Sequence, residues 1–201
     1  MFKDKKPMSF FLIVMVSLLI PIIPFAVIGE LPGQSWLSAA DDNAFLFGVT
    51  GTVLLLSDIL LPIPSTIVGT MLGARLGFLS GLFWCWSGLM LGNLIGYYLG
   101  RAVSSRSGEA LPQSPTLLVL AVTRPIPVLA EAVTFTAGAG GVELMPFLFV
   151  SFFANGVFAA ALAGNGAAFI PSDLFGVGLI LPMLLPVAGW LIWQTKFKGK
   201  N

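Results

Sequence analysis

The chain has 201 residues, of which 57% are hydrophobic and only 9% are charged, with a formal net charge of +1 and a mean hydropathy of +0.96. A soluble domain of this length carries about 25% charged residues, so the composition predicts an integral membrane protein. The lack of histidine excludes histidine-based metal sites and catalytic triads, and the single cysteine, Cys85, excludes an intrachain disulfide. The chain has no basic run with interleaved aromatic residues, so the sequence does not indicate nucleic-acid binding.

The first apolar run covers residues 7–29 and is uncharged, which is long enough to cross about 30 Å of hydrocarbon. A cleaved signal peptide is the competing interpretation, because small residues at 38–40 would suit cleavage, but the run is longer than the apolar region of such peptides. We therefore expect a transmembrane helix, followed by an acidic loop over residues 30–43.

Residues 44–74 carry one charge, Asp58, and are interrupted by Pro62 and Pro64. Neither side of the interruption is a convincing full span, so the pattern predicts a re-entrant helical hairpin that enters and leaves one membrane face. Such a hairpin is tolerated only where protein or water covers its broken backbone. Residues 78–100 are uncharged and should cross the membrane. Glycines at every fourth position give this crossing a face for close helix packing, namely Gly88, Gly92, Gly96 and Gly100.

A polar loop over residues 101–115 precedes a second interrupted segment, residues 116–141. Arg124, Pro125 and Pro127 lie at its break, and Glu131 follows, so we predict a second re-entrant hairpin. Two further crossings are expected over residues 144–170 and 174–193.

With four crossings and two hairpins, every lysine and arginine of the loops falls on one side of the membrane. This agrees with the positive-inside bias and predicts that the N- and C-termini are cytoplasmic. The loop residues concerned are Lys3, Lys5, Lys6, Arg101, Arg106, Lys196, Lys198 and Lys200.

The two interrupted segments belong to an internal repeat with an offset of about 63 residues. Pro64 and Pro127 match at this spacing, as do Gly100 and Gly164 at 64 residues. We place repeat 1 at about 44–100 and repeat 2 at about 115–170, within a single membrane domain over residues 1–201. One crossing per unit makes the second copy inverted, an arrangement typical of secondary transporters.

These residues resemble the DedA family, also called the VTT or SNARE-associated Golgi protein superfamily. The resemblance covers roughly residues 45–170 and rests on the run 61–65, the glycine-rich run ending at Gly100-Arg101, and Arg124 to Pro127 followed by Ala137-Gly138. It implies two opposed re-entrant hairpins and movement of polyprenyl (undecaprenyl) phosphate or phospholipids, associated in bacterial members with the proton-motive force. Many members carry an acidic residue at the position of Thr66 and a second arginine near residues 130–131.

Arg124 is permanently charged, so at hairpin depth it needs an anion. A lipid phosphate is one candidate, and a structural pair with Glu131 or Asp58 is the other. Those two carboxyl groups are candidates for proton coupling, and for each the alternative is a purely structural role. Ser65 at a half-helix N-terminus suits a phosphate, and Arg75 is either a head-group ligand or an interfacial anchor. Asn93 and Asn155 are expected to form hydrogen bonds between helices.

The sequence thus predicts an all-α polytopic membrane protein with no cofactor, no metal site and no enzymatic activity. The expected function is translocation of polyprenyl phosphate or a related anionic lipid between leaflets, in a bacterial inner (plasma) membrane. The partners would be membrane lipids, with protons as a coupling ion, no nucleic acid, and a homo-oligomer left open. The alternatives are a non-selective phospholipid scramblase, a proton-coupled small-ion antiporter and a non-transporting membrane assembly factor.

Overall fold

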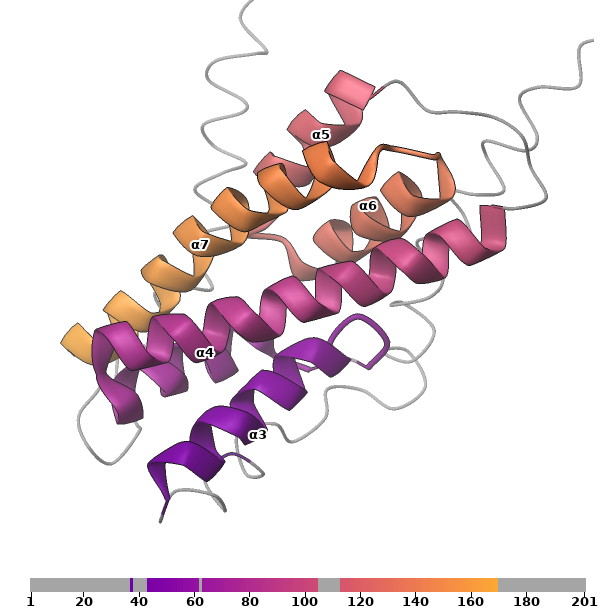
Figure 1. Ribbon diagram of the computed structural model, residues 1–201. Helices are drawn as coiled ribbons and strands as arrows, with labels where there is room; N and C mark the ends of the chain where they lie inside the picture. The colour runs from indigo at the N-terminus through magenta and orange to yellow at the C-terminus, as the bar shows by residue number, and fades with distance from the viewer. Residues whose placement is uncertain (1–36, 38–42, 62, 105–112, 170–201) are drawn as a thin grey trace, which may run out of the picture. The chain divides into compact units, whose positions relative to one another are not determined.

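A computed structural model of the protein describes residues 37, 43–61, 63–104 and 113–169 (Figure 1). Every regular element within these ranges is a helix, which confirms the all-α prediction for the described part of the chain. The helices are α3 (Ala44–Ser57), α4 (Ser65–Ser104), α5 (Gln113–Val122), α6 (Pro127–Ala139) and α7 (Leu144–Phe169). The expected crossings at 7–29 and 174–193, the turn residue Pro62 and the loop residue Arg106 lie outside the described residues.

Two of these helices, α4 and α7, are long and apolar enough to cross a membrane. In α7 the apolar stretch runs through all of Leu144–Phe169. In α4 the helical path is broken at Gly77, whose φ of 76° and ψ of 173° are not helical, and the ribbon bends near its N-terminal end (Figure 1). The segment after Gly77 corresponds to the predicted crossing over residues 78–100.

Local chemistry accounts for the helix starts. The Asn43 side chain caps α3, because its Oδ1 accepts hydrogen bonds from the backbone N–H groups of Phe45 (2.9 Å) and Leu46 (3.1 Å). Pro64 precedes α4, and its carbonyl accepts from the N–H groups of Ile67 and Val68. Helix α6 starts with Pro127, whose missing N–H costs nothing at a first helical position.

The order of elements occurs twice along the described chain. In each half a helix is followed by a proline-containing turn, a second helix, a glycine break and a long helix. The breaks are at Gly77 and Gly141, whose φ angles of 76° and 71° are both in the left-handed range. These two glycines are 64 residues apart, which is the spacing of the sequence repeat.

The chain forms two compact units. The described residues of the first unit are 56–61, 63, 89–104 and 113–155. The second unit contains residues 37, 43–55, 64–88 and 156–169. Each unit therefore takes helices from both halves of the sequence.

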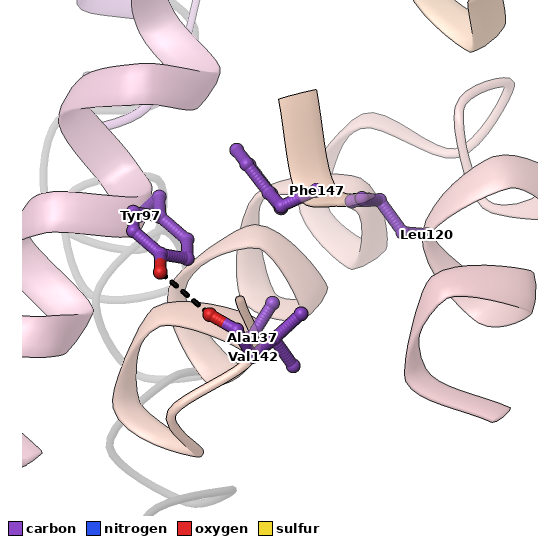
Figure 2. Packing of buried hydrophobic residues seen from close by; sticks show 5 residues of the cluster. All are labelled: Tyr97, Leu120, Ala137, Val142 and Phe147. Atoms are coloured by element: carbon purple, nitrogen blue, oxygen red, sulfur yellow. Dashed lines mark hydrogen bonds between the residues drawn. The ribbon is translucent and has the colours of Figure 1, made fainter. Parts of the chain in front are cut away.

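The core of the first unit is built around Tyr97 of α4 (Figure 2). Its ring lies 4.6 Å from that of Phe147, and its hydroxyl donates a 2.6 Å hydrogen bond to the carbonyl oxygen of Val142, just before α7. Leu120 of α5 and Ala137 of α6 complete the buried cluster. Helix α6 also approaches α4 through glycines, because a Cβ on Gly138 would collide with the backbone of Tyr97.

In the second unit α3 and α4 pack closely at small residues. A Cβ on Gly51 would lie 2.6 Å from Leu72, and one on Gly48 would lie 2.5 Å from the Trp84 ring. The Thr52 hydroxyl donates a 3.0 Å hydrogen bond to the Trp84 carbonyl oxygen. Helix α7 approaches the first segment of α4 just as closely, because a Cβ on Gly73 would collide with the backbone of Ala163.

Alanine at either glycine break should destabilise the protein. A Cβ at Gly77 or Gly141 would meet no atom within 4 Å, so the cost comes from the backbone angle alone, about 1–3 kcal/mol per site. Gly156→Ala is the matched control, because its Cβ would make an ordinary 3.8 Å contact with Trp86 inside a helix that favours alanine. Thermal unfolding in detergent should show a lower Tm for Gly77→Ala and Gly141→Ala, and an unchanged or higher Tm for Gly156→Ala. Equal Tm values in all three variants would contradict this account.

Candidate functional site

The site is organised by the turn between α5 and α6. The N–H of Ile126 donates to the carbonyl oxygen of Thr123 at 2.8 Å and closes this turn around Arg124 and Pro125. Pro125 cannot donate a backbone hydrogen bond, so α5 cannot continue through it. The result is that Arg124 is carried into the first unit, where only 7% of its surface is exposed.

The two hydrogen bonds of the Arg124 guanidinium go to neutral oxygens. Its Nη2 donates to Asn93 Oδ1 at 2.6 Å and to Thr134 Oγ1 at 3.2 Å. Its Nε is buried and has no partner among the described residues, and the same holds for Nδ2 of Asn93. Arg124 and Asn93 thus each have a buried N–H donor without an acceptor among the described residues. An unpaired buried donor costs free energy unless a water or a ligand accepts from it.

Close packing at Gly96 permits this arrangement. A Cβ on Gly96 would lie 2.7 Å from Ile59 and 3.1 Å from the Thr134 methyl group. The missing side chain lets α6 come close enough to α4 for Thr134 and Asn93 to share one guanidinium.

The α4 face that carries Gly96 has three further glycines, which also lie at close contacts or are buried. A Cβ on Gly88 would lie 2.8 Å from Leu55, one on Gly100 would collide with the Phe135 backbone, and Gly92 is buried.

A pair of carboxyl groups lies within electrostatic reach of Arg124. Glu131 comes from the second turn of α6 and Asp58 from the turn after α3, and both attract the guanidinium. The two carboxyl groups share a hydrogen bond with each other. Asp58 Oδ1 also accepts from the backbone N–H of Ile63 at 3.3 Å, which ties the carboxylate to its own turn.

The proximity of the two carboxyl groups bears on the charge of this cluster. A carboxylate has no proton to donate, so two carboxyl groups can bond to each other only when one is protonated. With one proton on the pair, the two carboxyl groups and the guanidinium would together be neutral. Neutrality is what makes such a cluster tolerable away from water.

The structure brings together three of the residues expected in the site. Arg124, Glu131 and Asp58 lie in the first unit. Ser65 and Arg75 belong to the second unit, where Ser65 is buried at the first position of α4 and Arg75 is exposed. Their part in substrate binding stays a prediction. The prolines Pro64, Pro125 and Pro127 lie at the starts and turns described above.

Two residues of the site were missed or given another role. Asn93 was expected to bond between crossing helices, but it accepts from Arg124 of the α5–α6 turn. Thr134 was not singled out, although it lies three residues after Glu131 on α6 and is fully buried. The sequence feature that could have pointed to these two residues is Arg124, since a buried guanidinium needs oxygen acceptors on the helices around it. Among the described residues no group of three histidine, cysteine, aspartate or glutamate side chains could hold a metal ion.

No protein-family model, no curated protein and no solved structure matches this chain. The resemblance noted from the sequence motifs therefore stays a prediction, and the geometry of the site carries the functional argument.

Replacing both carboxyl groups should cost far more stability than replacing one. In Glu131→Gln the amide can still donate to Asp58, and one negative charge remains beside Arg124. The double variant Asp58→Asn/Glu131→Gln leaves the guanidinium without a counter-charge and should lose about 3–5 kcal/mol. Unfolding in detergent measures the stability of the single and the double variant. Glu143→Gln is the control, because Glu143 is exposed. An equal loss in the single and double variants would contradict the shared proton.

Proposed function

We propose that this protein moves an anionic, phosphate-bearing lipid between the leaflets of a membrane, with polyprenyl phosphate as the first candidate. The proposal is supported by a strongly apolar chain with two helices able to cross a membrane, and by the charged side chain of Arg124, which is buried in the first unit. In this proposal the chain has four crossings and two re-entrant hairpins in inverted repeats. Its termini face the cytoplasm of a bacterial cell.

The observation that carries the proposal is the incomplete hydrogen bonding of Arg124. Its Nη2 donates to Asn93 and Thr134, whereas its Nε has no acceptor among the described residues. A phosphate offers several oxygens that accept strong, charge-assisted hydrogen bonds, and a planar guanidinium suits them well. The described residues bond to Nη2 and leave the Nε–H group for a head group.

The carboxyl pair gives a physical route for proton coupling. With one proton on Asp58 and Glu131 the cluster is neutral, so a bound phosphate would leave it with a net negative charge. Uptake of a second proton by the pair restores neutrality, and release of the lipid reverses the step. A single negative charge on the lipid would thus move with about one proton, because a buried uncompensated charge is costly.

The alternatives make different predictions in one assay. A non-selective scramblase would move neutral and anionic phospholipids equally in purified vesicles. A small-ion antiporter would move ions without any lipid substrate. An assembly factor would do neither and would tolerate changes at Arg124 as long as the chain folded.

Substitution of Arg124 should impair lipid movement in proteoliposomes loaded with labelled polyprenyl phosphate. Arg124→Ala should slow translocation about 10–100-fold, the equivalent of losing about 1.5–3 kcal/mol of charged hydrogen bonding. Arg124→Lys should also be slow, because an ammonium group cannot bond to both Asn93 and Thr134 and also present an N–H at the position of Nε. Arg101→Ala is the control, since Arg101 is exposed and bonds to the Tyr97 hydroxyl at 2.8 Å. Wild-type rates in folded Arg124→Ala protein would refute the site.

The same vesicles test the proton step. An imposed pH gradient should change the rate for the native protein. The folded double variant Asp58→Asn/Glu131→Gln should respond much less, because it has no carboxyl group left to take up a proton. A response of equal size in both proteins would show that the carboxyl pair does not couple the proton.

A further inference from the structure

A second group of buried polar side chains lies between α4 and α7 in the first unit. Two contacts fix how these helix segments face each other. The Tyr97 ring packs on the Phe147 ring, and seven residues earlier on α4 the Met90 sulfur accepts a 3.3 Å hydrogen bond from Asn155 Nδ2. Earlier residues of α4 therefore face later residues of α7, so the segments run antiparallel.

Asn93 and Ser151 lie between these two contacts and on the same helix faces. On α4, Asn93 is three residues after Met90 and four before Tyr97. On α7, Ser151 is four residues after Phe147 and four before Asn155. Residues three or four apart share a helix face, so the antiparallel register puts Asn93 opposite Ser151.

Each of the three polar residues here has a buried atom without a hydrogen-bond partner. Ser151 and Asn155 are fully buried and Asn93 is 5% exposed. The atoms are Asn93 Nδ2, Ser151 Oγ and Asn155 Oδ1. The orientation of the Asn93 amide follows from its bond to Arg124, since its Oδ1 must face the guanidinium and its Nδ2 must point elsewhere.

We propose that Asn93, Ser151 and Asn155 bind a buried water molecule between α4 and α7. These atoms offer one donor, one acceptor and one hydroxyl that can do either. A single water can accept from Asn93 Nδ2 and donate to Asn155 Oδ1 and Ser151 Oγ, which is the usual number of partners for an internal water. A metal cation would be repelled by the Asn93 N–H group, and an anion by the Asn155 carbonyl oxygen.

The water has a consequence for the arginine site. Its bond to Asn93 Nδ2 holds the amide with Oδ1 toward Arg124, so Ser151 and Asn155 are positioning residues that act through the water and Asn93. The water site itself does not depend on the proposed lipid transport. It would stand even if the protein moved no lipid.

The direction of the Tm change in Ser151→Ala distinguishes a site that holds water (wet) from one that does not (dry). If the hydroxyl bonds to water, its loss leaves the water short of a partner, and the Tm should fall by about 2–4 °C, as for a loss of about 1 kcal/mol. If the site is dry, the change removes an unsatisfied buried hydroxyl, and the Tm should stay or rise. Ser87→Ala is the control, because the Ser87 hydroxyl already donates to the Phe83 carbonyl oxygen at 2.7 Å. An unchanged or higher Tm for Ser151→Ala would overturn the proposal.

X-ray radiolytic footprinting of the full-length protein in detergent tests the water directly. Hydroxyl radicals formed from a bound water oxidise nearby sulfur, and Met90 lies against Asn155. Ser151→Val, whose methyl groups take the place of the water, should reduce Met90 oxidation at least twofold. Ser151→Thr keeps the hydroxyl and should match the native protein, and the fully buried Met71 of the second unit serves as the internal reference. Equal Met90 oxidation in native and Ser151→Val protein would overturn the water site. The same result is expected if Asn93 bonds directly to Ser151 with no water between them.

Discussion

The buried positive charge of Arg124 is the constraint on which the first unit depends. A guanidinium does not lose its proton in a protein, so its surroundings must supply oxygens and negative charge. The supply comes from separate parts of the chain: Asn93 on α4, Thr134 and Glu131 on α6, and Asp58 in the turn after α3. Those segments can meet only if the helices approach closely, and the absence of a side chain at Gly96 provides the room.

The sequence predicted the breaks at Pro64, Pro125 and Pro127, because proline acts on the backbone locally, whereas the glycine breaks were not predicted. The two expected hairpins end at about residues 74 and 141, and the structure breaks its helices at Gly77 and Gly141. The meeting of Arg124, Glu131 and Asp58 also agrees with the electrostatic reasoning applied to the sequence. The two hydrogen bonds of Arg124 were not predicted, because an asparagine or a threonine in an apolar helix can serve many partners, and only the packing of α4 against α6 selects one.

The first unit buries several polar side chains close to one another. The guanidinium donates to neutral acceptors, two carboxyl groups lie within its electrostatic reach, and three polar residues between α4 and α7 each have a buried atom without a partner among the described residues. The unit keeps an unused donor at Arg124 Nε, which a purely structural ion pair would not do.

The glycine contacts carry a consequence for how the chain acquires its structure during synthesis. Gly73, in the first half of the sequence, packs against Ala163 in the second half, and Gly138 packs back against Tyr97. A nascent chain that ends near residue 104 has therefore made helices whose partners do not yet exist. Packing of α4 against α6 and α7 has to wait until those helices have left the ribosome, and until then these close-approach surfaces of α4 stay open to lipid or to a chaperone.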